Sequence, residues 1–418
     1  MRAVRTIQIA LSISIGVSTI HAYPLDGYQK TGIRRLVGYQ LSNDGKIAKT
    51  IRLPEGGLLK SSDVVLRLKG KNDAFDLTAS TPRDPFLQSG LERIFAGRNT
   101  SYSIALLDIT DPSKPLYAAM REDEKRIPGS VGKLLVATGL FDAVAKLYPD
   151  PTKREKFLRE TVVAADNFVY RDGKTVPFYN DGDSRILNRR LEAGDKFNLY
   201  EWADHMLSQS SNAAASFTWE QVMLMRQFGA KYPISAADRT AWLKDTPKSE
   251  LGDASLRVLE EPLHAAGLNT DNLRIGTFFT GNGSSAIPGT SSYANPFELM
   301  RWLIKLEQGK IVDSWSSLEL KKLLYFSRPR YRYASSPALT KAAVFFKSGS
   351  LFKCKPGTSC KAYHGTDTNL MHSVAIVESG SKIYLVAMMS NVLGVNSAVE
   401  HQTVAGQIEK LIQSRPVQ

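Results

Sequence analysis

The segment 126–144 constrains the fold of this chain most, because it predicts a buried helix that opens on a serine. Pro128 and Gly129 interrupt whatever structure precedes them, and the apolar residues that follow recur at the spacing of a covered helix. Ser130 then lies at the helix N-terminus, and Lys133 lies one turn further along the same face. We therefore expect the rest of the chain to build a core around this helix.

A serine and a lysine at this spacing suit nucleophilic catalysis. The free N–H groups and the dipole of a first helical turn favour negative charge, such as an alkoxide or an oxyanion. A lysine buried one turn away would lose hydration, so its pKa would fall and it could act as a base. The pattern alone is weak evidence, since it recurs at Ser350/Lys353 and Ser379/Lys382 and since Ser130 could simply cap the helix.

Composition places the chain among ordinary globular proteins. Its 418 residues include 43% hydrophobic and 23% charged residues, enough for one large or two ordinary domains. The formal net charge of +13 fits a solvated basic surface or attraction to an anionic envelope polymer or membrane. We expect no nucleic-acid partner, because the sequence has neither a zinc-ligand pattern nor an RNA-binding signature.

Residues 1–22 resemble a secretory signal peptide. Arg2 and Arg5 form a basic start, residues 7–20 are mainly apolar, and Ala22 ends an acceptable cleavage site. The apolar run is short for a membrane span and is interrupted by serines. We therefore expect cleavage, export to the periplasm or medium, and no stable membrane insertion afterwards.

The chain has two cysteines, Cys354 and Cys360. In an oxidising compartment we expect them to form a disulfide that closes a small loop. Two cysteines without nearby histidines make a poor metal site, and we expect no metal and no cofactor.

The pattern predicts an N-terminal extension, residues 23–85, followed by a mixed α and β domain, residues 86–418. In the extension, an Asn-Asp-Gly turn predicts a hairpin of residues 36–41 and 46–53, and residues 64–69 are strand-like. The helices predicted in the domain cover 86–95, 131–148, 198–207, 295–306 and 399–412, and the strands cover 102–109, 116–120, 342–352, 370–377 and 382–389. Residues 217–270 are predicted to be a helical insertion, and residues 276–292 a long loop.

Three motifs, and the elements around them, make residues 86–418 resemble the penicillin-binding protein and serine β-lactamase superfamily, of class A-like type. The motifs are, in the family's order, Ser130-Val-Gly-Lys133, Ser210-Ser-Asn212 and Lys347-Ser-Gly349. The resemblance implies an α+β, β-lactamase/transpeptidase-like fold. That fold has an antiparallel sheet of about five strands flanked by helices and an all-helical subdomain.

Two other segments compete with these motifs. Lys30-Thr-Gly32 matches the family's third motif more literally, but it precedes Ser130 in the chain. Tyr293-Ala-Asn295 could be a second motif, as in some relatives. The predicted helix before Ser210 favours Ser210 and its neighbours instead.

The resemblance implies catalytic roles for five residues. Ser130 attacks a carbonyl and forms an acyl-enzyme, and Lys133 takes its proton. Ser210 relays a proton to the leaving amine. Asn212 holds the substrate amide or the lysine, and Lys347 supplies positive charge for a substrate carboxylate.

The resemblance also implies substrate-binding roles beside the third motif. Ser348 can donate a hydrogen bond to the substrate carboxylate, and Gly349 lets the substrate lie against the strand. The backbone N–H groups of Ser130 and Ser350 would form the oxyanion hole.

The chain departs from class A β-lactamases in the loop that carries their deacylating glutamate. The corresponding loop here, residues 276–292, has no Asp or Glu, and Glu260 and Glu261 lie upstream without the family's pattern. Fast deacylation of a β-lactam is therefore not expected.

We expect an exported serine hydrolase or acyltransferase, a D,D-carboxypeptidase or endopeptidase-like enzyme acting on peptidoglycan peptides and reacting with β-lactams. One alternative is a class A-like β-lactamase with a different deacylating group. Another is a catalytically silent envelope-binding protein, against which the complete motif set argues. The oligomeric state and the role of residues 23–85 stay open.

Overall fold

The computed structural model describes residues 25–49, 53–326 and 330–415. The predicted signal peptide, residues 1–22, lies outside the described residues. Among the helices that the structure describes, none combines the length and the apolar character needed to cross a bilayer.

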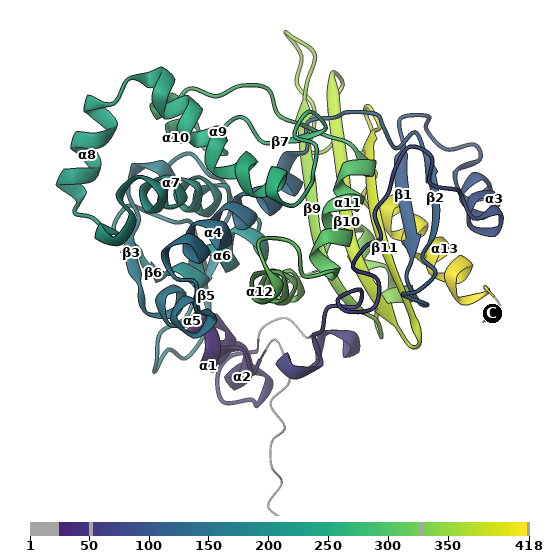
Figure 1. Cartoon of the computed structure of the whole chain (residues 1–418), viewed down its shortest axis with the longest axis horizontal. Helices are drawn as coiled ribbons and strands as arrows, with labels where there is room; N and C mark the ends of the chain where they lie inside the picture. The colour runs from purple at the N-terminus through teal and green to yellow at the C-terminus, as the bar shows by residue number, and fades with distance from the viewer. Residues whose placement is uncertain (1–24, 50–52, 327–329, 416–418) are drawn as a thin grey trace, which may run out of the picture.

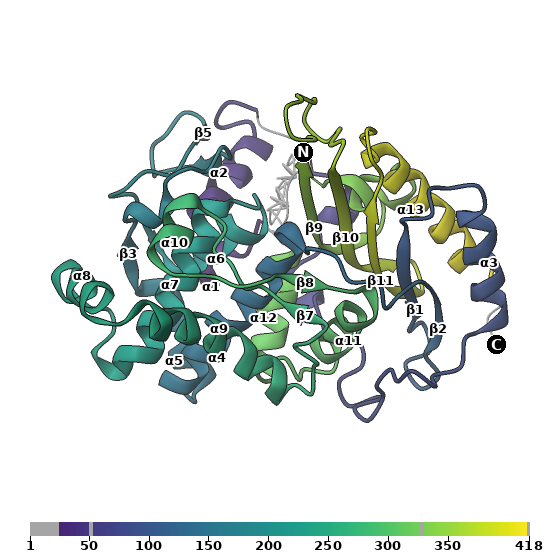
Figure 2. The same ribbon diagram turned by 90° about the horizontal axis from the view of Figure 1, so that it is seen from above.

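A five-stranded antiparallel sheet forms one half of the molecule, as predicted (Figure 1). Its strands are, in spatial order, β2 (Leu116–Met120), β1 (Ser103–Asp108), β11 (Lys382–Asn391), β10 (Thr368–Ser379) and β9 (Ala343–Lys353). Strand β9 therefore has one free edge. Helices α3 (Pro85–Phe95) and α13 (Ala398–Gln413) cover the outer face, as Figure 2 shows. Helices α11 (Pro296–Glu307) and α12 (Ser314–Tyr325) pack against the inner face.

Strand residues alternate between two apolar cores. Ile104 and Leu106 join the core under α3 and α13, whereas Ala105 and Leu107 join the larger core on the other side. Because both faces are covered, all six residues of β1 are buried. This two-sided burial explains why the strand reads as a nearly continuous apolar run.

Helices form most of the other half of the molecule (Figure 1). They are α4 (Lys133–Leu147), α5 (Pro151–Glu160), α6 (Leu199–Leu207), α7 (Asn212–Phe228), α8 (Ala236–Asp245), α9 (Lys248–Ala265) and the short α10 (Gly281–Ala286). Short antiparallel pairs accompany them: β3 (Val162–Ala164) with β6 (Lys196–Asn198), β4 (Val176–Phe178) with β5 (Leu187–Arg189), and β7 (Leu273–Arg274) with β8 (Tyr293–Ala294). The sequence analysis did not predict these pairs, which are at most three residues long.

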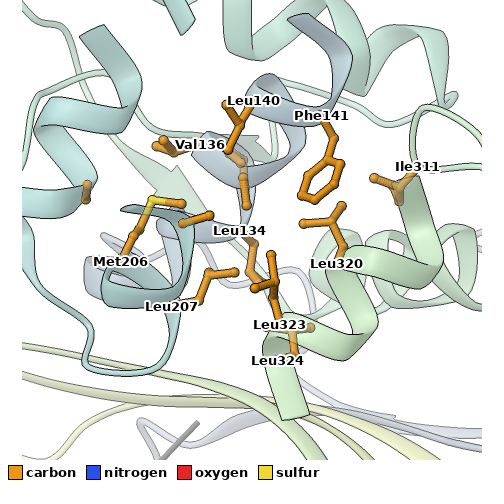
Figure 3. Close-up of a cluster of buried hydrophobic side chains, with 14 of the residues drawn as sticks. Leu134, Val136, Leu140, Phe141, Met206, Leu207, Ile311, Leu320, Leu323 and Leu324 are labelled. Carbon is orange, nitrogen blue, oxygen red and sulfur yellow. The ribbon is translucent and has the colours of Figure 1, made fainter. Parts of the chain in front are cut away.

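Helix α4 is the centre of the helical half, as its apolar pattern predicts. It packs against α6, α7, α9 and α12. The side chains that meet there are fully buried and are drawn in Figure 3: Leu134, Val136, Leu140, Phe141, Met206, Leu207, Ile311, Leu320, Leu323 and Leu324. Burying each such side chain stabilises the fold by about 1.5–3 kcal/mol, so the first turn of α4 is held firmly in place.

The N-terminal extension differs from its predicted hairpin and strand. Residues Arg34–Asn43 form α2, after the single turn α1 (Tyr28–Thr31). Ile33, Leu36 and Tyr39 recur at helical spacing and are buried, so the turn signal that follows ends a helix rather than joining two strands. Residues 64–69 form no strand because the backbone N–H of Leu68 donates to the Glu307 carbonyl at the end of α11.

A buried ion pair joins this extension to α6, the helix that leads to the second motif. Arg35 Nε and Nη2 each lie 2.6 Å from an Asp204 carboxylate oxygen, and both side chains are at most 1% exposed. The Asp204 carboxylate raises the pKa of Arg35 against the effect of burial. The Arg35 guanidinium therefore stays charged inside the protein.

Replacing Arg35 by methionine is expected to lower the free energy of unfolding by about 3–5 kcal/mol, because Asp204 would be left buried and unpaired. Urea denaturation measures the loss. The double variant Arg35→Met/Asp204→Leu is expected to recover most of it, since neither charge then remains. A single variant within 1 kcal/mol of the parent (about the value of an exposed ion pair) would contradict this account.

Candidate active site

Ser130 lies where the sequence predicts, at the entrance to the central helix. It belongs to a single 3₁₀ turn, Gly129–Gly132, that runs directly into α4. Lys133 is the first residue of α4 and is fully buried. Ser130 keeps a 9% exposed fraction, so its hydroxyl reaches a cavity while the lysine behind it does not reach solvent.

Lys133 connects the first motif to the second. Its Nζ lies 3.1 Å from Ser130 Oγ. The same nitrogen donates to the Ser210 carbonyl oxygen at 2.6 Å and to Asn212 Oδ1 at 2.7 Å. The structure therefore brings together residues that lie nearly 80 positions apart in the chain.

Ser210 connects the second motif to the third. Its Oγ accepts a hydrogen bond of 2.8 Å from Lys347 Nζ on β9 and lies 3.4 Å from Lys133 Nζ. Its φ of 57° is unusual for a residue other than glycine, asparagine or aspartate. This strained conformation points the carbonyl toward Lys133 and the hydroxyl toward Lys347.

A cavity of about 360 Å³ opens in front of Ser130. Ser348 and Ser350 of β9 line it from one side, and Ser210 lines it from the other. The free edge of β9 therefore faces the predicted nucleophile across a space large enough for a small substrate.

Gly349 packs against the turn that contains Ser130 at a distance that leaves no room for a side chain. A Cβ at Gly349 would lie 2.7 Å from the Pro128 carbonyl oxygen and 3.2 Å from Ser130 N. The glycine thus lets β9 approach the backbone of residues 128–131. This close packing is a reason for glycine that the sequence analysis did not identify.

Replacing Gly349 by alanine is expected to slow acylation by penicillin about 100-fold, because the new methyl group must push the Ser130 turn away from β9. Stopped-flow or quenched labelling measures the rate constant. Gly406→Ala in α13 is the matched control, since a Cβ there meets its nearest neighbour at 3.4 Å. Equal rate constants for Gly349→Ala and the parent would contradict the packing argument.

The sequence analysis missed an aspartate that organises the second motif. Asp172 Oδ2 accepts hydrogen bonds from Ser211 Oγ at 2.9 Å and from the backbone N–H groups of Asn212 at 2.6 Å and Ala213 at 2.9 Å. It therefore satisfies free donors at the N-terminus of α7. Asp172 lies in an irregular, polar stretch between short strands, where no periodicity distinguishes it.

Two further cations line the cavity and were also missed. Lys174 Nζ donates to the Ser210 carbonyl oxygen at 2.7 Å, the same oxygen that Lys133 contacts. Arg332 Nη1 donates to the Gly349 carbonyl oxygen at 2.8 Å. Neither residue belongs to a recognisable motif, so only the fold could place them here.

Burial and neighbouring cations lower the pKa of three lysines in the site. Burial first, and then the charges of Lys174 and Lys347, hold the pKa of Lys133 well below its ordinary value. Burial, with Lys174 and Arg332, does the same to the pKa of Lys347. Burial and Arg332 lower the pKa of Lys174 to about 8, although Asp172 opposes the shift.

The competing motifs lie elsewhere. Thr31 of the N-terminal Lys-Thr-Gly segment ends α1, and its Oγ1 donates to the Gly27 carbonyl. Tyr293 belongs to β8, and Asn295 caps α11 by accepting from Glu298 N. Ser379 ends β10 and donates to Glu409. None of these four residues lines the cavity in front of Ser130.

Cys354 and Cys360 form the predicted disulfide, with their Cα atoms 5.7 Å apart. They close a small loop directly after β9. Tyr363 follows this loop, lines the cavity, and lies with its ring centroid 5.8 Å from the Arg332 guanidinium. The disulfide therefore limits the motion of one rim of the site.

Comparison with known proteins decides the family. The family model Beta-lactamase2, described as the β-lactamase enzyme family, matches residues 86–414. The chain belongs to this family. It is therefore a serine hydrolase of the β-lactamase and penicillin-binding-protein type, as the motifs predicted. Among curated proteins, none matches the sequence.

Two solved β-lactamase structures share the fold of this β-lactamase-family enzyme. The TLA-3 extended-spectrum β-lactamase is 11% identical, with a TM-score of 0.51 and coverage of 78% of this chain and 97% of its own. A β-lactamase from Sphaerobacter thermophilus is 13% identical, with a TM-score of 0.50 and coverage of 78% and 94%. A mutant of PBP-A, in an acyl-enzyme complex with penicillin G, is 13% identical, with a TM-score of 0.49 and coverage of 79% and 97%.

Proposed function

We propose that this enzyme is an exported D,D-carboxypeptidase or endopeptidase that acylates Ser130 with peptidoglycan stem peptides and reacts with β-lactams in the same way. The observation that carries the proposal is a contrast within the site. The groups needed for acylation surround Ser130, whereas the loop that would supply an acidic deacylating residue, 276–292, contains none.

Lys133 is proposed as the base for acylation. Its lowered pKa favours the neutral amine, which has two N–H donors and one lone pair. The Ser210 carbonyl and the Asn212 amide oxygen take up the two donors. The lone pair is then left for the Ser130 hydroxyl 3.1 Å away. Asn212 thus holds the lysine, which is one of the two roles that the resemblance implies for it.

Ser210 is proposed to return the proton to the leaving amine. Its Oγ lies between Lys133 and Lys347, at 3.4 Å and 2.8 Å from the two nitrogens. A hydroxyl can accept a proton from one partner while it donates its own to another. The leaving nitrogen would receive that proton and depart as the amine.

The oxyanion would be held by backbone amides. A Cβ at Gly349 would lie 3.2 Å from Ser130 N, and a Cβ at Gly129 would lie 3.3 Å from Ser350 N. Since Gly129 and Gly349 each precede the amide in question, the two N–H groups belong to backbone segments in close contact. Two such donors stabilise the charge that develops on the carbonyl oxygen.

Lys347 and Ser348 are proposed to bind a substrate carboxylate. Lys347 Nζ donates to Ser210 Oγ and to the Ser348 carbonyl, and both of these residues line the cavity. Burial lowers the pKa of Lys347, and a carboxylate bound beside it would favour its charged form. Stem peptides end in a carboxylate, and penicillins carry one beside the reacting amide. A shared carboxylate site explains how one enzyme would react with both.

Deacylation is proposed to be slow with β-lactams. The Phe279 ring, on the loop that would carry a glutamate, lies with its centroid 5.0 Å from Lys133 Nζ. Asp172 is occupied by backbone and hydroxyl donors, so it is a poor base. Glu260 and Glu261 form ion pairs with arginines elsewhere.

A tripeptide ending in D-Ala-D-Ala tests the proposal. Release of free D-alanine, measured by an oxidase-coupled assay and absent in Ser130→Ala, is the expected result for a carboxypeptidase. Cleavage of cross-linked muropeptides alone would assign the endopeptidase activity. Rapid turnover of nitrocefin with no peptide cleavage would overturn the proposal in favour of a β-lactamase.

A further inference from the structure

A buried histidine reaches the segment that leads into the Ser130 turn. His372 lies within β10 and is fully buried, and no step of the proposed acylation uses it. Its Nε2 lies 3.0 Å from the backbone carbonyl oxygen of Ile127. A carbonyl oxygen can only accept, so Nε2 carries the proton and donates it. Burying an imidazole costs free energy unless its nitrogens are hydrogen-bonded, and this contact satisfies one of them.

The second ring nitrogen of His372 fixes the orientation of the ring. Nδ1 lies 3.4 Å from the backbone nitrogen of Ser390 on β11, whose N–H donates to it. Burial lowers the pKa of His372 to about 4, so the ring is neutral near neutral pH. A neutral imidazole has one donor and one acceptor, and the two backbone groups use one each. The ring therefore bridges the sheet and the segment before Ser130.

The sheet register places His372 beside the close contact between β9 and the Ser130 turn. His372 pairs with Gly349, and directly paired residues of neighbouring strands point to the same face of a sheet. Gly349 leaves no room for a side chain against residues 128–131. His372 therefore holds by a hydrogen bond the same stretch of backbone that Gly349 meets by close packing.

Little backbone separates the Ile127 carbonyl from the Ser130 N–H. Only Pro128 and Gly129 lie between them. The proline ring restricts φ, which is −70° here, so a displacement of the Ile127 carbonyl is passed on toward Ser130. The Ile127 side chain is 42% exposed, so its packing does little to hold the segment. The hydrogen bond from His372 is therefore well placed to fix the position of this backbone.

Other backbone contacts indicate that the fold survives loss of this hydrogen bond. Arg126 exchanges two backbone hydrogen bonds of 2.8 Å with Ala294 of β8. Val131 N donates to the Pro128 carbonyl at 3.1 Å within the turn itself. Without the His372 donor the turn would still form, but its position relative to β9 would be set less precisely.

We propose that His372 is a positioning residue for acylation, because its hydrogen bond to the Ile127 carbonyl sets the Ser130 N–H and hydroxyl against β9. His372 acts through the backbone of residues 127–130 and is not itself a catalytic residue. This inference deepens the proposed function and rests on it, since it requires that Ser130 is the residue acylated.

Two variants that differ by one methylene group separate the roles of the two ring nitrogens. In His372→Gln the amide nitrogen is as many bonds from Cα as Nε2 is, so it can donate to Ile127. In His372→Asn the amide reaches only as far as Nδ1. Stopped-flow measurements with benzylpenicillin and the full chain give the acylation rate constant at saturation and the half-saturating concentration.

His372→Asn is expected to lower the saturated acylation rate constant about 10- to 100-fold, because the Ser130 N–H and hydroxyl are then less well placed for the transition state. The half-saturating concentration is expected to change by less than about threefold, since the cavity that binds the penicillin is left intact. His372→Gln is expected to keep a rate constant within about threefold of the parent's, because the donor to Ile127 is restored.

His401 provides the matched control. It is fully buried in α13, on the other face of the sheet (Figure 2). Its ring nitrogens contact the hydroxyls of Ser373 at 3.0 Å and Ser390 at 3.3 Å. His401→Asn is expected to keep an acylation rate constant within about threefold of the parent's. If His372 served stability alone, thermal unfolding would show a lower Tm in His372→Asn while its rate constant matched that of the control.

A measurement on the parent enzyme does not depend on the folding of any variant. Nitrogen-15 NMR of histidine-labelled protein distinguishes the two tautomers of a neutral imidazole. The Nε2–H tautomer is expected for His372, because only that form can donate to the Ile127 carbonyl.

The outcomes separate this inference from the function on which it rests. A slow His372→Asn variant with recovery in His372→Gln supports the positioning role. Parent-like acylation in His372→Asn, equal losses in both variants, or an Nδ1–H tautomer in the parent would overturn the positioning role and leave the proposed function standing. Absence of any acylation of the parent by benzylpenicillin would overturn both.

Discussion

Replacing Ser130 by alanine is expected to abolish covalent labelling by a fluorescent penicillin. The Ser130 hydroxyl combines a buried lysine nitrogen at about 3 Å, an adjoining helix N-terminus and an open cavity. Labelling is followed by gel fluorescence after denaturation. Because Ser130 is already 9% exposed and small, the variant is expected to fold like the parent.

Two serines with the same spacing to a lysine are the matched controls for this variant. Ser350→Ala is expected to keep substantial labelling, since its proposed contact with the oxyanion uses a backbone N–H. Ser379→Ala is expected to label like the parent, because Ser379 ends β10 and donates to Glu409. Labelling of a folded Ser130→Ala variant at the parent's rate would show that the chemistry has been assigned to the wrong residue.

Replacing Lys133 by alanine is expected to slow acylation by about 10²–10⁴-fold, the range that general-base help typically provides. The lysine is fully buried, so Lys133→Met, which fills more of the space, controls for the cavity that alanine leaves. Both variants should lose about the same rate if the proton transfer is what matters. Thermal unfolding confirms that each one is folded.

The pH dependence of acylation follows from the lowered pKa of Lys133. The base must be neutral, so the rate constant of the parent is expected to fall as the pH drops through that lowered value. Because Lys174 and Lys347 contribute to the shift, Lys174→Gln is expected to move this fall to higher pH. A rate constant in Lys133→Met that equals the parent's at all pH values would contradict the role of this lysine.

Much of the fold follows from the sequence because its elements show their own periodicity. Strands β1 and β2, helix α3 with its Asp84 cap, and helix α11 with its Asn295 cap lie within a residue or two of their predicted bounds. Apolar side chains with a regular spacing and a capping residue at the start are local signals. Tertiary contacts reinforce them here and do not overrule them.

The extension is different, because tertiary contacts decide its structure. Residues 34–43 are helical with a buried Arg35 that pairs with Asp204, and residues 64–69 bond to the end of α11. Neither partner is adjacent in sequence. A short apolar run next to a turn signal fits a hairpin as well as a helix that ends at the turn.

From the sequence alone, only the site residues that belong to a recognised motif could be predicted. Ser130, Ser210 and Lys347 lie together as their order in the chain suggested, and their catalytic roles stay predictions. Lys174 and Arg332 come from irregular segments, and only the folded chain brings them to the cavity. Such residues change the pKa of their neighbours in the site, but no local sequence pattern identifies them.

Intact mass spectrometry after incubation with benzylpenicillin tests most directly that this enzyme forms a lasting acyl-enzyme at Ser130. The account predicts one adduct with the full mass of the penicillin, because attack on the lactam ring expels no leaving fragment. It further predicts that the adduct persists after the free penicillin is removed and maps to the peptide containing Ser130. No adduct, or an adduct on another residue, would contradict the account.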